Sequence, residues 1–261
     1  MGSEELVKIV FFDIDGTLLD HEKKLPASTK KAIKQLQDNG VFVAIATGRA
    51  PFMFESLREE LGIDTFVSFN GQYVVFEGEV IYKNPLSLSE IKRLHEHSEK
   101  NNIPIVFMNE ETMKSSVPHH SRIEEALSSL KFPHPELHAD FYEDHDIYQA
   151  LLFCSEDEEG KFVGQYDKFH FIRWHTYSTD VLPFGGSKAE GIKILMEKVG
   201  FGLEDVYAFG DGLNDIEMLK VAGYGVAMGN ASQLLKQEAD FVTKDVDNDG
   251  ILYGLKELDL I

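Results

Sequence analysis

Cysteine is almost absent from this chain, and long apolar runs are absent altogether. Its 261 residues include one cysteine, Cys154, which excludes an intrachain disulfide and is typical of a reducing compartment. No apolar stretch is long enough to span a bilayer, and the acidic start MGSEELVKIVFF lacks the pattern of a signal peptide. We therefore expect a soluble cytoplasmic protein without a membrane partner.

Positive charge is scarce as well. Lys and Arg together number 25 against 45 Asp and Glu, so the formal net charge is -20 at pH 7. Such a charge repels the phosphates of nucleic acids and of anionic lipids, and no long run of Lys or Arg overrides it. Nucleic acid is therefore not expected as a partner, and the sequence carries no indication of the oligomeric state.

Hydrophobic residues make up 43% of the chain, enough for one large core and a second, smaller one. Unbroken apolar runs without alternation predict buried parallel strands. Such runs stand in LVKIVFF, VFVAIATG and TFVSFNG, with helical patterns between them in LPASTKKAIKQLQDNG and RAPFMFESLREELG. This β-α-β-α-β order is typical of a doubly wound parallel sheet.

The α/β rhythm is interrupted between residues 84 and 184 and returns from Gly186 onwards. The interruption mixes helix and strand patterns and contains most of the histidines. We therefore predict an α/β fold with a Rossmann-like, doubly wound parallel-sheet core. This core is discontinuous, formed by residues 1–83 and 185–261, and residues 84–184 form an inserted α+β domain.

Polar residues follow the ends of several predicted strands. Asp13 and Asp15 come directly after the first strand, in FFDIDGTLLD. The others are Thr47, Gly48 and Arg49 after the second strand, Lys188 at a helix start, and Asp211, Asn214 and Asp215 in GDGLND. Because an open α/β sheet binds its ligand at the carboxyl ends of its strands, we expect these residues to lie close together.

The chemistry that suits this set is phosphoryl transfer. Clustered carboxylates such as Asp13, Asp211 and Asp215 repel one another unless a hard cation lies among them, and Mg²⁺ prefers oxygen ligands. One carboxylate can attack phosphorus and form an aspartyl-phosphate. Mg²⁺ and Lys188 can neutralise the transferring group, and Asp15 can carry the proton of the leaving group.

The motifs DIDGT, a strand ending in Thr, a helix-starting Lys and GDGLND, in this order, resemble the haloacid dehalogenase (HAD) superfamily of phosphatases. The large insertion between the Thr and Lys motifs, with SFNGQYV before it and GGSKAEGI after it, resembles the Cof-type subgroup with a type IIB cap. The resemblance implies a Mg²⁺-dependent phosphatase for small phosphate monoesters, namely a sugar phosphate, a nucleotide or a flavin-type phosphate. It also implies that the inserted domain is a cap that sets substrate specificity.

The resemblance assigns roles to individual residues. Asp13 is the expected nucleophile and Asp15 the general acid/base. The expected phosphate ligands are Thr47, Gly48, Lys188 and Asn214, and the expected metal ligands are Asp13, Asp211 and Asp215 together with the backbone carbonyl of Asp15. Arg49 is an equally good candidate for contacting the substrate or for pairing with a carboxylate.

Two other functions stay open at this point. A sugar phosphomutase on the same fold would use the same pair of aspartates but would need a bisphosphate intermediate. A non-catalytic phosphometabolite-binding protein would show no turnover, and the intact motifs argue against it. The stretch DVDNDG resembles the opening of a calcium-binding loop, but Lys256 replaces the required Glu, so we expect an acidic loop that caps the last helix.

Overall fold

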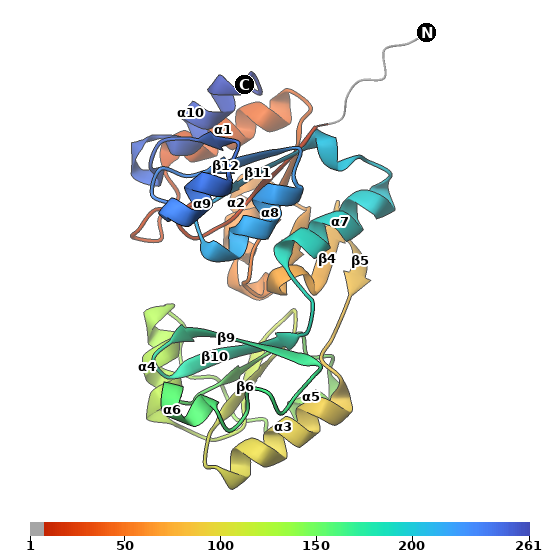
Figure 1. Ribbon diagram of the computed structural model, residues 1–261, viewed down its shortest axis with the longest axis vertical. Helices are drawn as coiled ribbons and strands as arrows, with labels where there is room; N and C mark the ends of the chain where they lie inside the picture. The colour runs from red at the N-terminus through yellow and green to blue at the C-terminus, as the bar shows by residue number, and fades with distance from the viewer. Residues whose placement is uncertain (1–7) are drawn as a thin grey trace. The chain divides into compact units, whose positions relative to one another are not determined.

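The computed structural model describes residues 8–261, which divide into two compact units. The first unit contains the chain up to Arg49, Phe54–Lys83 and Ser187–Ile261, and the second contains Ala50–Met53 and Asn84–Gly186. In Figure 1 the red-to-orange and blue ends of the colour range therefore occur together in the first unit. The second unit is a single long insertion plus one short segment.

The first unit is built on an eight-stranded sheet with the order β13-β12-β11-β1-β2-β3-β4-β5. Its strands are β1 (Ile9–Phe12), β2 (Phe42–Ala46), β3 (Phe66–Ser68), β4 (Tyr73–Phe76), β5 (Glu79–Lys83), β11 (Val206–Gly210), β12 (Tyr224–Ala227) and β13 (Phe241–Val242). All neighbours from β13 to β3 pair in parallel, and only the β4 and β5 hairpin is antiparallel. The predicted α/β fold with a parallel-sheet core is confirmed.

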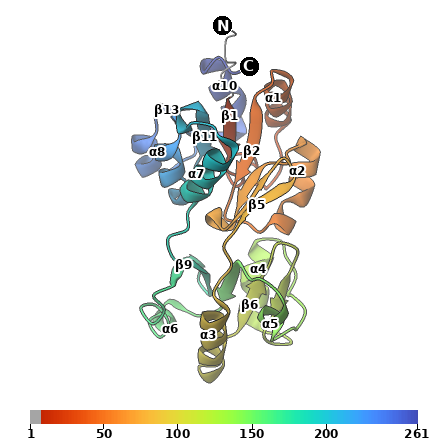
Figure 2. The same cartoon turned by 90° about the vertical axis from the view of Figure 1, so that its right-hand side faces the viewer.

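Helices cover both faces of this sheet. They are α1 (Ala27–Asp38), α2 (Glu55–Leu61), α7 (Lys188–Val199), α8 (Ile216–Val221), α9 (Gln233–Glu238) and α10 (Gly250–Glu257). Figure 2 shows α7 and α8 on one side of the sheet and α1 and α2 on the other. Every residue of β1 is fully buried, as expected for a central strand covered on both faces.

The helix predicted in RAPFMFESLREELG is wrong in its first part. Residues Pro51–Met53 form a short 3-10 turn, and α2 starts only at Glu55. Between them Phe54 leaves the helical backbone conformation (φ -132, ψ 17). This break lets its ring pack edge-on against Phe66, with ring centroids 5.4 Å apart, in the buried core.

The second unit is an antiparallel five-stranded sheet with the order β7-β6-β8-β10-β9. Its strands are β6 (Ile105–Met108), β7 (Met113–Ser115), β8 (Gln149–Leu152), β9 (Phe169–His175) and β10 (Ser178–Pro183). Its helices are α3 (Leu88–Lys100), α4 (Ser121–Ser129), α5 (Phe141–Asp144) and α6 (Glu156–Glu159). Ile91 and Leu94 of α3 pack on Phe107, Leu152 and Val181 of the sheet, which makes a separate hydrophobic core.

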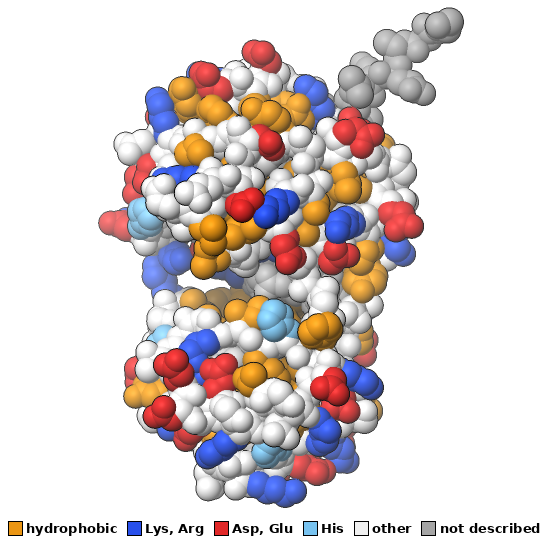
Figure 3. Space-filling view, in the orientation of Figure 1, with side chains coloured by type: hydrophobic (Ala, Val, Ile, Leu, Met, Phe, Trp, Pro, Cys, Tyr) orange, Lys and Arg blue, Asp and Glu red, His pale blue; other side chains and the backbone are white. Residues whose placement is uncertain are grey.

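The surface carries charges of both signs. Figure 3 shows Asp and Glu interspersed with Lys and Arg over the visible face, instead of a basic stripe of the kind that follows a nucleic-acid backbone. Across residues 8–261, no helix combines the length and the apolar character that crossing a membrane requires.

Candidate active site

The predicted site residues of the first unit follow adjacent parallel strands. Asp13 comes directly after β1, Thr47 after β2, and Asp211 after β11. The backbone N–H of Asp13 donates to the carbonyl of Phe209 at 3.0 Å, so the ladder of the sheet continues up to this residue. The buried strand therefore fixes the position of Asp13, whose residual exposure is 8%.

A glycine brings the two aspartate motifs together. Gly16 has φ +80, and a Cβ atom at this position would lie 2.2 Å from Oδ2 of Asp211. A side chain there would be strained and would also displace the carboxylate. The hydroxyl of Thr17, the residue after Gly16, donates to Oδ1 of Asp211 at 3.2 Å. The turn after β1 therefore holds the carboxylate that follows β11.

A fully buried lysine joins two of the carboxylates. Lys188, the first residue of α7, places Nζ 2.5 Å from Oδ1 of Asp13 and 2.6 Å from Oδ1 of Asp215. Burial alone would lower the pKa of Lys188, but the charges of Asp13 and Asp215 outweigh it and raise the pKa. The ammonium group therefore stays charged inside the protein.

Asp215 also fixes the turn of the GDGLND motif. Its Oδ2 accepts hydrogen bonds from the backbone N–H groups of Asp211 at 3.0 Å and Gly212 at 2.9 Å. Its Oδ1 faces Lys188, and the side chain is completely buried. One carboxylate thus connects the turn after β11 to the start of α7.

The carboxylates of Asp13, Asp211 and Asp215 each offer an oxygen, and these oxygens all lie within 4.8 Å of one another. Burial, and then the charge of Asp215, raise the pKa of Asp211 to about 6. Burial also raises the pKa of Asp13, to about 7, although the Lys188 charge opposes it. Three carboxylates face a single ammonium, so an oxygen-ligated divalent cation such as Mg²⁺ fits this cluster.

Thr47 contacts the loop after β3, and this loop packs against the start of α7. The Thr47 hydroxyl accepts a hydrogen bond from the backbone N–H of Arg49 at 3.1 Å. The backbone N–H of Thr47 donates to the carbonyl of Val67 at 2.8 Å. Gly71, in the FNG turn, has φ +96, and a Cβ there would lie 2.2 Å from the carbonyl oxygen of Ser187. The glycine therefore permits the close packing of this loop against the residue before Lys188.

Asp15 is held by two cations. Arg49 donates from Nε to Oδ2 at 2.9 Å and from a terminal nitrogen to Oδ1 at 2.7 Å, while Nζ of Lys23 lies 2.5 Å from Oδ1. Burial alone would raise the pKa of Asp15, but Arg49 and then Lys23 outweigh it and lower the pKa. Arg49 therefore pairs with a carboxylate, one of its two expected roles, and Asp15 is ionised here.

The contacts of Asn214, which was predicted as a site residue, differ from those of Asn230, which was not. Asn214 is exposed, and its side chain forms no hydrogen bond within the part of the chain that the structure describes. Asn230 was not predicted, yet its Nδ2 donates to the carbonyl of Gly16 at 2.8 Å and to Oδ2 of Asp211 at 3.3 Å. Its position after β12, a further parallel strand of the same sheet, is the signal that could have identified it.

The prediction that the acidic loop at residues 245–250 caps the last helix is wrong. Asp245 accepts the backbone N–H of Asp247 at 3.0 Å and so caps a short 3-10 turn, whereas α10 begins after Asp249, whose side chain forms no cap hydrogen bond. The left-handed conformation of Asp249 (φ 59) separates the two turns.

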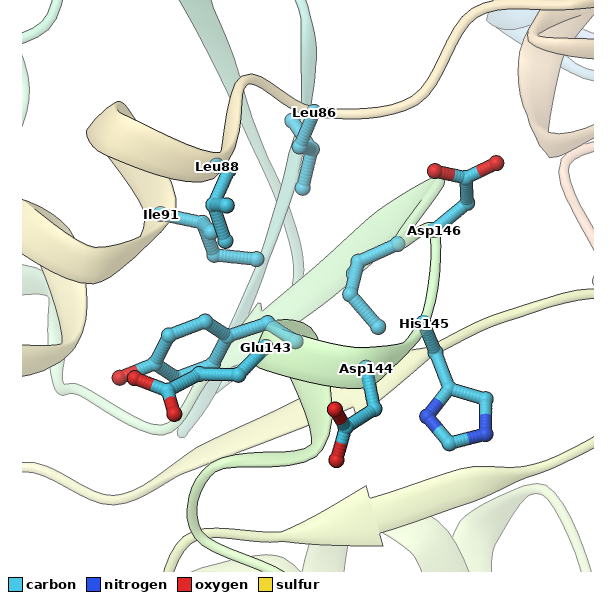
Figure 4. Close-up of a pocket in the computed structure, with 9 residues that line it drawn as sticks. Leu86, Leu88, Ile91, Glu143, Asp144, His145 and Asp146 are labelled. Carbon is cyan, nitrogen blue, oxygen red and sulfur yellow. The ribbon is translucent and has the colours of Figure 1, made fainter.

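A separate hollow of about 360 Å³ lies in the second unit. Figure 4 shows Leu86, Leu88 and Ile91 on one side of it and the carboxylates of Glu143 and Asp144 on another. Because its charged lining is acidic, it would repel a phosphate group. The hollow is therefore not a candidate for the phosphate site.

The chain belongs to the family of haloacid dehalogenase-like hydrolases, which matches residues 10–255. The resemblance drawn from the four motifs is confirmed, including its Cof-type, subclass IIB character. The family assignment covers both units of the structure and both segments of the discontinuous first unit.

Several of the proteins that this chain resembles are phosphatases by name. The chain is similar to YkrA of Bacillus subtilis (strain 168), named as a candidate phosphatase, with 54% identity over 254 residues, 97% of this chain and 98% of YkrA. YcsE of the same organism, a 5-amino-6-(5-phospho-D-ribitylamino)uracil phosphatase, is 31% identical over 256 residues, 96% of this chain and 95% of its own. The solved structure of the subclass IIB sugar phosphatase BT4131 has a TM-score of 0.83 and 32% identity, over 98% of this chain and 100% of its own. The chain is thus an enzyme, a phosphoric monoester hydrolase of the haloacid dehalogenase type.

Proposed function

We propose that this enzyme hydrolyses a small phosphate monoester with the help of Mg²⁺ and through an aspartyl-phosphate on Asp13. The observation that supports it most is the buried contact of Lys188 with Asp13 and Asp215, with Asp211 beside them. A buried ammonium next to a nucleophilic carboxylate can hold the oxygens of a phosphoryl group. The Thr47 hydroxyl, the Gly48 backbone and Asn214 are the further phosphate ligands in this proposal.

In the first step an oxygen of the Asp13 carboxylate attacks phosphorus, and the bond between phosphorus and the leaving oxygen breaks. The leaving oxygen takes a proton from the Asp15 carboxyl group and departs as an alcohol, so Asp15 must bind a proton before this step, although Arg49 and Lys23 lower its pKa. Asp15 is then a carboxylate, and Asp13 carries the phosphoryl group. Lys188 balances the charge on the phosphoryl oxygens while they transfer.

In the second step a water molecule attacks the same phosphorus, and the bond from phosphorus to the Asp13 oxygen breaks. Asp15, now ionised, takes a proton from this water, so its carboxyl group is restored for the next turnover. Inorganic phosphate leaves, and the Asp13 carboxylate is free again. The step needs no co-reactant other than water.

The proposal assigns the cation to the carboxylates of Asp13, Asp211 and Asp215 and to the backbone carbonyl of Asp15. A bound Mg²⁺ there supplies the positive charge that phosphoryl oxygens require as they transfer. The hydrogen bonds from Thr17 and Asn230 to Asp211 orient the carboxylate that would serve as its ligand.

The substrate in this proposal is a small phosphorylated metabolite: a sugar phosphate, a nucleotide or a flavin-type phosphate. YcsE is named for a ribitylaminouracil phosphate and BT4131 for sugar phosphates, and both names support this range. We further propose that the second unit is the cap that sets specificity. The cytoplasmic location stays a prediction.

Phosphate release from a panel of sugar phosphates, nucleotides and flavin phosphate tests the proposal. We expect release with Mg²⁺, none with EDTA, and a loss of at least about 10³-fold in Asp13→Asn. Release that is unchanged in Asp13→Asn would contradict the proposed nucleophile. Isomerisation of a sugar phosphate without release would instead identify the phosphomutase.

A further inference from the structure

The loop after the DIDGT motif is built around one side chain. Oδ1 of Asp20 accepts the backbone N–H groups of Glu22 and Lys24, each at 2.8 Å, and the N–H of Lys23 donates to the Asp20 carbonyl at 3.0 Å. Lys23 has a left-handed backbone conformation, with φ 63. These bonds fix the direction from which the Lys23 side chain leaves the loop.

A contact across the loop restrains it further. Nε2 of His21 lies 3.6 Å from an oxygen of Asp247 and 4.0 Å from one of Asp245. The loop therefore lies near the segment before α10 on one side and, through Lys23, contacts Asp15 on the other. Its two lysines differ in this respect, since Lys24 pairs with the exposed Glu22 in the same loop.

Asp15 receives three hydrogen bonds from these two cations. Arg49 bridges both carboxylate oxygens, and Lys23 adds a second donor to Oδ1 from a different segment of the chain. The bond from Lys23 comes from the hydrogen-bonded loop, so it restricts the Asp15 carboxylate from a second segment of the chain.

We propose that Lys23 is a positioning residue that holds the Asp15 carboxylate in the orientation required for proton transfer. This inference rests on the proposed function, in which Asp15 exchanges a proton with the leaving group and with water. Lys23 acts through Asp15 and binds neither the phosphoryl group nor the cation. Proton transfer by a positioned carboxyl group contributes about 10²–10⁴-fold to a rate, so partial loss of positioning has room to act.

The test compares Lys23→Met, Lys23→Arg and Lys24→Met. Methionine and arginine are unbranched at Cβ like lysine, so we expect each to meet similar strain in the left-handed conformation of residue 23. We expect Lys23→Met to lower kcat about tenfold with KM changed less than about threefold. Lys23→Arg should recover most of the rate, because a guanidinium also donates to Oδ1, and Lys24→Met should match the wild type.

Two kinetic results would overturn the inference. A higher KM with unchanged kcat in Lys23→Met would make Lys23 a substrate ligand, and wild-type kinetics in Lys23→Met would leave it without a role. Crystal structures of the wild type and Lys23→Met provide a readout that is independent of turnover. A reoriented Asp15 side chain in the variant supports the inference, and an unmoved Asp15 contradicts it. Failure of the proposed function would appear separately, as absence of turnover in the wild type.

Discussion

Each of the two units encloses an aspartate whose pKa is raised to about 7, but the surroundings of the two differ. In the first unit, burial raises the pKa of Asp13 although Lys188 opposes it, and further carboxylates surround the pair. In the second unit, burial raises the pKa of Asp180 on β10, and its polar neighbours Gln149 and Trp174 are neutral.

The buried carboxylate of Asp13 belongs to the site proposed to carry out the reaction, whereas that of Asp180 affects only stability. Beside a cation, the ionised form of a buried carboxylate gains a partner of opposite charge, and in that form it can act as a nucleophile or ligand. A carboxylate enclosed by neutral groups gains no such partner, and its raised pKa makes folding depend on pH. The following variants test this comparison.

Removing the lysine should have the largest effect on stability. Lys188→Met leaves Asp13 and Asp215 buried without their cation, and we expect a loss of about 3–5 kcal/mol in the free energy of unfolding. Urea unfolding in EDTA measures it, because added cations could partly replace the ammonium. Lys193→Met in the same helix is the matched control, since the exposed pair of Lys193 with Glu190 contributes at most about 1 kcal/mol. Equal stability of the two variants would contradict the role of the buried charge.

Adding Mg²⁺ should stabilise the first unit through its carboxylates. At a concentration of about 100 times Kd, a bound ion adds about 2.7 kcal/mol, which raises Tm by roughly 5–10 °C in a protein of this size. Asp211→Asn removes one ligand and should reduce this rise to about a degree. A scan of Tm against MgCl₂ and against EDTA for both proteins measures the effect. A wild-type Tm that does not change with the concentration of Mg²⁺ would argue against the cation site.

Neutralising Asp180 should have the smallest effect, and its sign follows from the pKa. The folded-state pKa of about 7 lies above the ordinary value of 3.8, so the folded protein binds more protons between these values. Stability therefore falls as pH rises through this window and levels off above about pH 7. Asp180→Asn should gain stability over the wild type by about 1 kcal/mol between pH 5 and pH 8, an amount discounted for partial solvent contact.

Thermal unfolding of Asp180→Asn and the wild type at several pH values measures this gain. The advantage of the variant should grow with pH and then stay constant. A Tm difference that is the same at pH 5 and pH 8 would mean that the Asp180 carboxyl group titrates at an ordinary pKa.

The central strands could be predicted from sequence because a parallel strand covered on both faces leaves an unbroken apolar run. β1 and β2 are such strands, and all four residues of β1 are completely buried. β10 could not be recognised in the same way, because Ser178, Thr179 and Asp180 interrupt its apolar pattern. Tertiary packing buries Ser178 and Thr179 and half-buries Asp180, and periodicity does not report such packing.

The meeting of Asp13, Asp211 and Asp215 could be expected because parallel strands deliver their carboxyl ends to one edge, whereas Lys188 was expected there from its place at a helix start. Their chemical roles stay predictions until they are tested. Lys23 could not be predicted, since its contact with Asp15 depends on the left-handed backbone of one loop residue. Such a conformation is uncommon for lysine and has no sequence signal here.

The central claim is that Asp13 carries the phosphoryl group between the two steps. Mass spectrometry of an acid-quenched reaction of Asp15→Asn with p-nitrophenyl phosphate tests it most directly, because this leaving group needs no general acid, whereas loss of the general base slows hydrolysis of the intermediate. We predict one added phosphoryl group on the peptide that contains Asp13, and none in the Asp13→Asn/Asp15→Asn double variant. Phosphate release without a labelled Asp13 peptide, or a phosphoryl group on another residue, would contradict the account.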